Sequence, residues 1–441
     1  MSRGASAAVP TSPATVMRPS PGLARRIAFV LIFFAAHVVM VVNFWPLGED
    51  MVHGDGSGKG MIIPLRYDFL RLPADEFTMK FKAEGRIAAD FAQIYFPARN
   101  PDGPAYGEGD ETPDPFGRPS RIAPAIISLC AWTLCRLDYG PASLAHAALQ
   151  YLIFLGIFLY AFKTLNVSRF IPLGVLLANA CLFLTPVGLT SMERGQFSLY
   201  VATAYLLLLL GLIRRNVLLV ALSALFAYVK WTSFPFIFVA IGTWLLSAGS
   251  RTEFVYRVKA AGAFAMVTGI LFLAYIDQGL QFLSVVLPQE YLHRGGGMSL
   301  LSVWPRFLVK SLPFILAGAG VVLARRSRND ASHLLPFLVG VAILLVVYPT
   351  TVFDYSVPCL LGFIPLVSWW VGLPGNRGSW RSVVVAGGFL SFLILASFSG
   401  TVLVYRILHD NMIYVYMAFA LLFMLLSFTY NTTPRPEISR Q

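Results

Sequence analysis

Long apolar runs recur along almost the whole of this 441-residue chain, and no other feature restricts its fold as strongly. A transmembrane α-helix needs about 20 predominantly apolar residues, and runs near this length follow one another from residue 141 to residue 429. Only 13% of the residues are charged, against about 25% in an ordinary soluble chain. The runs and the low charge exclude a soluble enzyme, a disordered protein and a collagen-like repeat. They predict an all-α, multi-pass membrane protein.

We expect about twelve spanning helices. Residues 27–45 form the first, because this stretch is too long for a signal-peptide core and no small-residue cleavage site follows it. Residues 122–135 are too short to span comfortably, so we expect a re-entrant or interfacial helix there. The other spans are expected near residues 141–162, 170–189, 197–213, 216–230, 233–248, 260–276, 306–324, 334–352, 356–373, 382–404 and 412–429.

Composition divides the chain into three parts. Residues 1–24 are rich in Pro, Ser and Ala and predict a disordered cytoplasmic tail, and residues 430–441 predict a second one. Residues 25–429 form the expected transmembrane domain. Within it, residues 46–121 hold 13 of the 22 acidic residues and predict a large extracytoplasmic loop with interfacial helices.

The net charge of +12 is distributed in a way that predicts the topology. Loops assigned to the inner side carry 18 basic and 3 acidic residues, whereas everything assigned to the outer side carries 16 basic and 19 acidic residues. This asymmetry is the positive-inside pattern, not the basic face of a nucleic-acid-binding protein. It predicts a multi-pass protein of the cell membrane with both termini in the cytoplasm.

The four cysteines, Cys130, Cys135, Cys181 and Cys359, all lie in apolar stretches. A free cysteine in such surroundings usually packs as a small hydrophobic residue. We therefore expect buried thiols and no disulfide framework.

Candidate catalytic and binding residues gather on the predicted outer side. Asp90 lies in the outer loop, with Tyr95 following it in an apolar, aromatic segment, and a carboxylate in a partly dry pocket can act as a general base. Its alternative role is that of one acid among many on a solvated loop. Arg194 and Gln196 lie in a tight outer turn, where an arginine can also be a simple headgroup anchor. Lys230 ends a short helix beside a Trp and a Pro, and a lysine so close to hydrocarbon needs a partner or an anionic ligand.

Two further outer segments carry candidate ligand-binding groups. In the loop from about residue 277 to residue 304, His293 and Arg294 precede three glycines, whose backbone N–H groups can wrap an anion. In a later turn, Asp354 and Tyr355 are candidates to contact sugar hydroxyls. The sequence contains no metal-ligand spacing and no nucleotide-binding loop, so we expect neither a metal nor a cofactor.

The order of these features resembles a known family. An inner N-terminus and one helix precede a large outer loop with Asp90, and then come Arg194-Gly195-Gln196, Lys230 before a Pro turn, a Gly/Ser outer loop and Asp354-Tyr355 before a late helix. This plan resembles the GT-C glycosyltransferases, specifically the polyprenol-phosphate-dependent, mannosyltransferase-like glycosyltransferase family 87, from about residue 25 to residue 428.

The resemblance implies a GT-C-type bundle and transfer of a mannose-like sugar from a polyprenyl-phosphate donor to a lipid-linked or glycan acceptor, with inversion. It implies that Asp90 is the catalytic base, and it matches Gly195-Gln196 and Lys230 to family positions. From the charges, we expect the donor phosphate to bind Arg194, Lys230, His293 and Arg294.

Three other functions are open at this level. A transporter or flippase would place polar residues at the bilayer midplane in related halves, whereas here they lie on one side. A polysaccharide polymerase or ligase would use outer cations but would not need Asp90. A non-catalytic scaffold would leave Arg194 and Lys230 without a role.

Overall fold

The structure is a computed structural model, and it shows an all-helical protein. No strand occurs among the residues that it describes. The expected tails, the first helix at residues 27–45 and most of the outer loop lie outside those residues. The structure describes residues 89–100, 105–106, 120–286, 300, 305–326, 331–347, 353–397 and 412–428.

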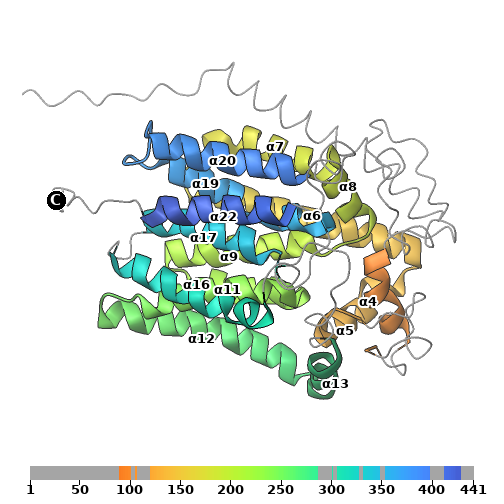
Figure 1. The fold of residues 1–441 in the computed structure, drawn as a ribbon. Helices are drawn as coiled ribbons and strands as arrows, with labels where there is room; N and C mark the ends of the chain where they lie inside the picture. The colour runs from red at the N-terminus through yellow and green to blue at the C-terminus, as the bar shows by residue number, and fades with distance from the viewer. Residues whose placement is uncertain are drawn as a thin grey trace, which may run out of the picture.

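Figure 1 shows the helices side by side in a bundle, with α4, α5 and α13 at one end of it. In chain order the helices are α4 Ala89–Arg99, α5 Pro124–Trp132, η2 Leu134–Arg136, α6 Tyr139–Thr164, η3 Ser168–Phe170, α7 Ile171–Phe183, α8 Pro186–Glu193, α9 Ser198–Arg214, α10 Val217–Val229, η4 Trp231–Ser233, α11 Phe234–Leu246, α12 Arg251–Leu273, α13 Ile276–Gln281, η5 Phe282–Val286, α16 Arg306–Arg326, α17 Ala331–Leu345, α18 Phe353–Leu360, α19 Phe363–Gly372, α20 Trp380–Ser397 and α22 Met412–Phe428.

Helix α9 is the central element of the bundle. Every residue from Ser198 to Gly211 is buried, and α9 packs against α6, α10, α18 and α19. A helix that is apolar on all sides is stable only where neighbours cover all of it. The N-terminal end of α9 is therefore fixed at one end of the bundle. The turn that precedes it, between α8 and α9, carries Arg194 and Gln196.

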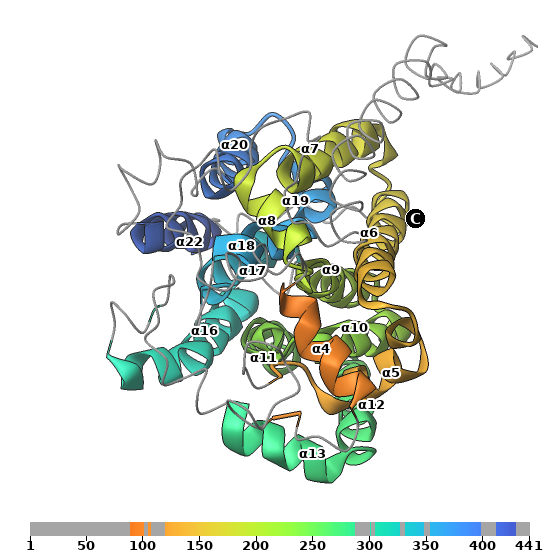
Figure 2. The same ribbon diagram turned by 90° about the vertical axis from the view of Figure 1, so that its right-hand side faces the viewer.

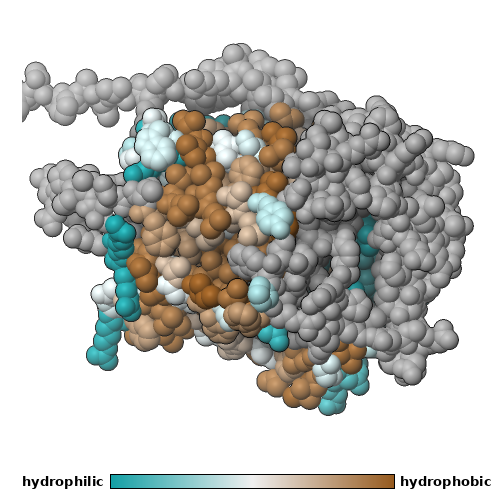
Figure 3. Space-filling view, viewed as in Figure 1, coloured by the Kyte–Doolittle hydropathy of each residue, from teal (hydrophilic) through white to brown (hydrophobic). Residues whose placement is uncertain are grey.

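Four helices, α6, α12, α16 and α20, are long and apolar enough to cross a membrane. Large apolar side chains remain exposed on them, including Met266 (61%) and Ile270 (59%) of α12 and Phe314 (67%) of α16. Figure 3 shows these apolar surfaces as a brown area across the middle of the described face. The remaining apolar helices have 10–17 residues, and the expected number of twelve spans stays a prediction.

Two segments that we expected as single spans are each divided into two helices. Residues 170–189 form α7 and the start of α8, which begins at Pro186; proline has no backbone N–H to continue the preceding helix. Residues 356–373 form most of α18 and α19, with a break at Gly362. A side chain at Gly362 would meet the Ala202 carbonyl oxygen of α9 at 2.4 Å, so the break permits a close approach to the central helix.

The short helix expected at residues 122–135 is α5, which has 9 residues. At 1.5 Å per residue such a helix is about 14 Å long, roughly half the thickness of the hydrocarbon core. It packs against α4 and η2 at the end of the bundle. Whether α5 is re-entrant or interfacial stays a prediction.

The expectation that all four cysteines are free thiols is wrong. Cys130 and Cys135 form a disulfide, with Cα atoms 5.1 Å apart, while Cys181 and Cys359 are free and buried. The apolar sequence around Cys130 did not indicate that its helix ends at Trp132. The turn after that end brings Cys135 back to Cys130 within the separation that a disulfide requires.

Candidate functional site

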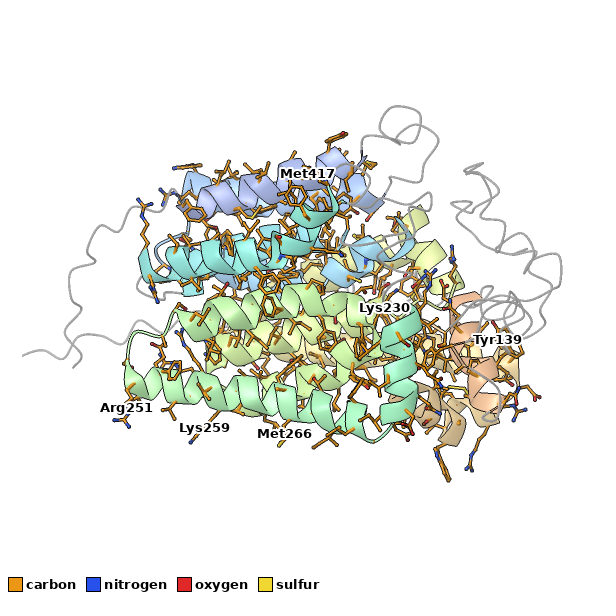
Figure 4. The ribbon with its side chains drawn as sticks, turned by 60° about the horizontal axis from the view of Figure 1, so that its bottom comes forward. Tyr139, Lys230, Arg251, Lys259, Met266 and Met417 are labelled. Carbon is orange, nitrogen blue, oxygen red and sulfur yellow. A yellow bond between two sulfur atoms is a disulfide. The ribbon has the colours of Figure 1, made fainter. Side chains whose placement is uncertain are left out.

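Three segments that are distant in the sequence meet at the end of the bundle formed by α4, α5 and α13. They are the first turn of α4 with Asp90, the turn between α8 and α9 with Arg194 and Gln196, and the residue after α10, Lys230. Figure 2 views this end directly, with α4 lying next to α8, α9 and α10. Figure 4 places Lys230 at this end and Arg251 at the opposite one.

The Asp90 carboxylate accepts hydrogen bonds from three side chains. Arg194 Nε is 3.1 Å from Asp90 Oδ2, Gln196 Nε2 donates to the same oxygen, and Gln93 Nε2 is 3.2 Å from Oδ1. The backbone N–H of Asp90 also donates to the Arg194 carbonyl at 2.8 Å. The carboxylate is thus held from its own helix and from the turn before α9.

Helix α8 ends in a motif that explains how the turn presents these donors. The Gln196 N–H donates to the Ser191 carbonyl at 3.0 Å and the Gly195 N–H donates to the Met192 carbonyl at 3.1 Å. These two bonds, with a left-handed residue between them, are the Schellman motif. Gly195 supplies that residue with φ +64°, a conformation that glycine adopts without the usual Cβ penalty. Arg194 and Gln196, on either side of it, both reach Asp90.

Lys230 joins the network through Gln196. It follows the last residue of α10 in an extended conformation, φ −137° and ψ 105°, and its Nζ donates to Gln196 Oε1 at 2.8 Å. The two partners fix the orientation of the Gln196 amide, because its oxygen faces an ammonium group and its nitrogen faces a carboxylate. Gln196 therefore bridges Asp90 and Lys230.

The network is largely shielded from solvent and contains both cations and a carboxylate. The side chains of Arg194 and Asp90 are 8% and 13% exposed. Burying an ion is costly unless it is paired and hydrogen-bonded, which explains why each of these ions lies among polar partners. Two cations, Arg194 and Lys230, and one carboxylate, Asp90, therefore belong to one hydrogen-bonded group.

Gln93 is a member of the network that sequence reasoning missed. It lies three residues after Asp90 on α4, so both side chains project from one face of the helix. Its Oε1 accepts the backbone N–H of Arg121 at 3.3 Å, which ties the segment before α5 to α4. The Asp-x-x-Gln spacing was the sequence feature that could have predicted this contact.

Tyr95 occupies a different place from Asp90. Its hydroxyl donates to the Leu137 carbonyl at 2.9 Å, and its ring packs edge-on against Tyr139, with centroids 5.1 Å apart. These contacts fix α4 against the start of α6. A contact between Tyr95 and a substrate stays a prediction.

Tyr106 fixes the adjoining segment in a similar way. Its hydroxyl donates to the Ile122 carbonyl at 2.9 Å. Burial, and secondarily the neighbouring Tyr228, raise the pKa of Tyr106 well above its usual value. The hydroxyl therefore stays a neutral donor, holding its segment to the start of α5.

Comparison of the chain with protein-family models, with curated proteins and with solved structures finds no match.

The other expected site residues are only partly located. Asp354 and Tyr355 lie at the start of α18, and this helix packs against α8 and α9 near the Arg194 turn. His293 and Arg294 lie outside the described residues. Within the described part of the chain, no group of three or more His, Cys, Asp or Glu side chains is arranged to hold a metal ion.

Proposed function

We propose that this protein is an integral-membrane glycosyltransferase of the GT-C type. It moves a mannose-like sugar from a polyprenyl-phosphate donor to a lipid-linked or glycan acceptor, with inversion at the anomeric carbon. The observation that carries the proposal is the network of Asp90, Arg194, Gln196 and Lys230, in which a fixed carboxylate lies among cations at one end of an apolar bundle.

The opposite end of the bundle supports an extracytoplasmic position for this network. Basic side chains there fit the positive-inside rule, and Figure 4 shows Arg251 at that end. The Cys130–Cys135 disulfide, which joins α5 to η2 beside α4, supports the same orientation, because disulfides persist mainly in oxidising compartments. The basic residues in the helix ends and turns assigned to the inner side include Lys163, Arg169, Arg214, Arg215, Arg325, Arg326 and Arg377.

The proposed reaction needs a base and a group that stabilises the leaving phosphate. Asp90 takes the proton of the acceptor hydroxyl while the acceptor oxygen forms a bond to the anomeric carbon. The bond from that carbon to the phosphate oxygen breaks, and its electron pair stays on the polyprenyl phosphate. Arg194 and Lys230 stabilise the charge that develops there. No nucleotide-sugar donor takes part in this scheme.

Arg194 can bind both the Asp90 carboxylate and the donor phosphate, because a guanidinium carries five N–H donors in a fixed plane. Its Nε holds Asp90, and in this proposal its terminal nitrogens contact the donor phosphate. Lys230 is a compact cation on a flexible stem, so it can turn from Gln196 toward a phosphate. In this proposal, Asp90 lies on the acceptor side of Arg194 and the phosphate on the other.

The direct test is transfer by the purified protein in detergent or proteoliposomes. Polyprenyl-phosphate mannose labelled in the sugar, mixed with a lipid-linked glycan acceptor, is expected to give a labelled acceptor and free polyprenyl phosphate. The same sugar on a nucleotide is expected to give no product. Movement of the intact labelled lipid across the bilayer without transfer would instead indicate a flippase.

A further inference from the structure

A buried arginine, Arg257, joins two helices near the end of the bundle that carries Arg251. It lies in the second turn of α12. Its guanidinium donates hydrogen bonds to the Trp244 carbonyl, to the Ser247 hydroxyl at 2.9 Å and to the Glu253 carboxylate. Arg257 therefore compensates the charge of Glu253 and fastens the start of α12 to the last turn of α11.

Two exposed arginines lie beside this buried ion pair. The side chain of Arg215, which follows α9, is 71% exposed, and its Nη2 is 3.7 Å from Glu253 Oε1, too far for a hydrogen bond. Arg325, in the last turn of α16, donates to the Leu246 carbonyl at the end of α11 over a long 3.5 Å. Among the described residues neither guanidinium has another hydrogen-bond partner. Most of the five N–H donors of each side chain can therefore bind an acceptor from outside the chain.

The charges of these four side chains do not cancel. Arg257 and Glu253 form a close pair, so Arg215 and Arg325 contribute two further positive charges beside the ends of α9, α11 and α16 and the start of α12. A guanidinium is the side chain best suited to a phosphate group, because its planar set of donors matches two phosphate oxygens at once. The arrangement therefore fits an anionic phosphate group.

The neighbouring surface indicates which kind of phosphate fits. Leu246 and Phe254 at the same helix ends are 58% and 48% exposed. Figure 4 shows Arg251, Lys259 and Met266 projecting from one side of α12, away from the rest of the bundle. This side of α12 is thus basic near the end of the bundle and apolar further along. A phospholipid has the same order, with its phosphate at the membrane surface and its acyl chains in the hydrocarbon, whereas a free phosphate would leave the apolar side chains uncovered.

We propose that Arg215 and Arg325 bind the phosphate group of an anionic phospholipid in the leaflet at this end of the bundle, the cytoplasmic leaflet in the proposed orientation. The Arg257–Glu253 pair holds the ends of α11 and α12 in the arrangement that places the two cations. Any basic residue near an anionic leaflet gains some attraction, but here two guanidiniums lie beside the end of one helix. The inference goes beyond the proposed sugar transfer and does not depend on it.

The test measures how phosphatidylglycerol binds to the purified protein in detergent, by native mass spectrometry and by the shift in the midpoint of thermal unfolding. We expect phosphatidylglycerol to raise the midpoint more than phosphatidylcholine, which carries a phosphate but no net charge. The double variant Arg215→Gln/Arg325→Gln is expected to bind phosphatidylglycerol about 10-fold more weakly and to lose most of this shift. Each protein is compared with its own lipid-free midpoint, so that a change in stability does not count as a change in binding.

Arg169→Gln/Arg377→Gln is the matched control, because it removes the same two charges from exposed positions assigned to the same side of the membrane. Arg169 leads into α7 and Arg377 precedes α20, and Figures 1 and 2 show these helices on the side of the bundle opposite α12. We expect this variant to bind phosphatidylglycerol as the unaltered protein does.

Three results would overturn the proposal. Equal losses in the two double variants would mean that net charge alone attracts the lipid. Unaltered binding of phosphatidylglycerol to Arg215→Gln/Arg325→Gln would remove these arginines from the site. Inorganic phosphate is expected to leave the midpoint unchanged, and a shift as large as that with phosphatidylglycerol would make this a site for free phosphate.

Discussion

The guanidinium Nε of Arg194 lies 3.1 Å from the Asp90 carboxylate, although 104 residues separate the two in the chain. Between them runs all of α5, α6, α7 and α8. The pair therefore forms only when the bundle is assembled, and it links α4 to the turn that precedes the central helix α9. Because both side chains are nearly buried, water compensates poorly for the loss of either partner.

The first prediction concerns the energy of this ion pair. Removing one partner of a buried pair leaves the other charge uncompensated and costs about 3 kcal/mol or more, whereas removing both is often nearly neutral. We expect Arg194→Gln and Asp90→Asn each to lower the unfolding free energy by about this amount. The double variant is expected to lose less than the sum of the two. Equal additive losses, measured by denaturant or thermal unfolding in one detergent, would mean that the pair is not energetically coupled.

Much of the candidate site was predictable residue by residue. Asp90, Arg194, Gln196 and Lys230 each stood out because a charged or amide group beside hydrocarbon needs a reason. The charge asymmetry placed all four on one side. Their mutual contacts were not predictable, since they depend on how helix ends far apart in sequence are arranged by packing around α9.

The wrong expectation about the cysteines has an equally local cause. The Cys130–Cys135 bond was missed because composition, not the position of the helix end at Trp132, decided the interpretation. The hydrogen bond from the Tyr95 hydroxyl to the Leu137 carbonyl was not predictable from the sequence, and a contact between Tyr95 and substrate stays a prediction.

The second prediction is that Lys230 contributes to donor binding. Lys230→Met keeps most of the aliphatic stem and removes the charge, so the protein is expected to bind polyprenyl-phosphate mannose about 10-fold more weakly, the loss of one charge-assisted contact. Acceptor affinity is expected to change little. Lys163→Met, at an exposed lysine near the inner end of α6, is the control and should bind the donor normally.

Binding of the labelled donor to purified protein measures this effect directly. Unaltered donor affinity in Lys230→Met, together with a lower unfolding temperature, would make Lys230 a structural partner of Gln196. The phosphate site would then have to be sought around His293 and Arg294.

The third prediction concerns topology. Asp277 in α13 and Gly375 after α19 are both exposed, and the proposed orientation places them on opposite sides of the membrane. In intact cells, a membrane-impermeant maleimide is expected to label Asp277→Cys and to leave Gly375→Cys unlabelled until the membrane is opened. The native cysteines give little background, because two are paired and two are buried. Labelling of Gly375→Cys from outside would invert the topology and place the Asp90 network in the cytoplasm.

The central claim is that Asp90 removes the proton from the acceptor hydroxyl. Asp90→Asn retains size and polarity and loses the ability to accept a proton, so turnover should fall by about 100-fold or more. Asp138→Asn, the same change at an exposed aspartate before α6, should leave turnover unchanged. Both variants are compared with the unaltered protein below their unfolding temperatures, so that lost stability does not count as lost catalysis.

The most direct measurement is the single-turnover rate at which Asp90→Asn transfers labelled mannose from polyprenyl-phosphate mannose to the acceptor, with both substrates saturating. Saturation removes differences in binding, and a single turnover removes product release, so the rate reports the chemical step. We expect a loss of about 100-fold or more with the donor still bound. A variant that transfers the sugar at nearly the unaltered rate would contradict this expectation and would leave Asp90 as the structural partner of Arg194.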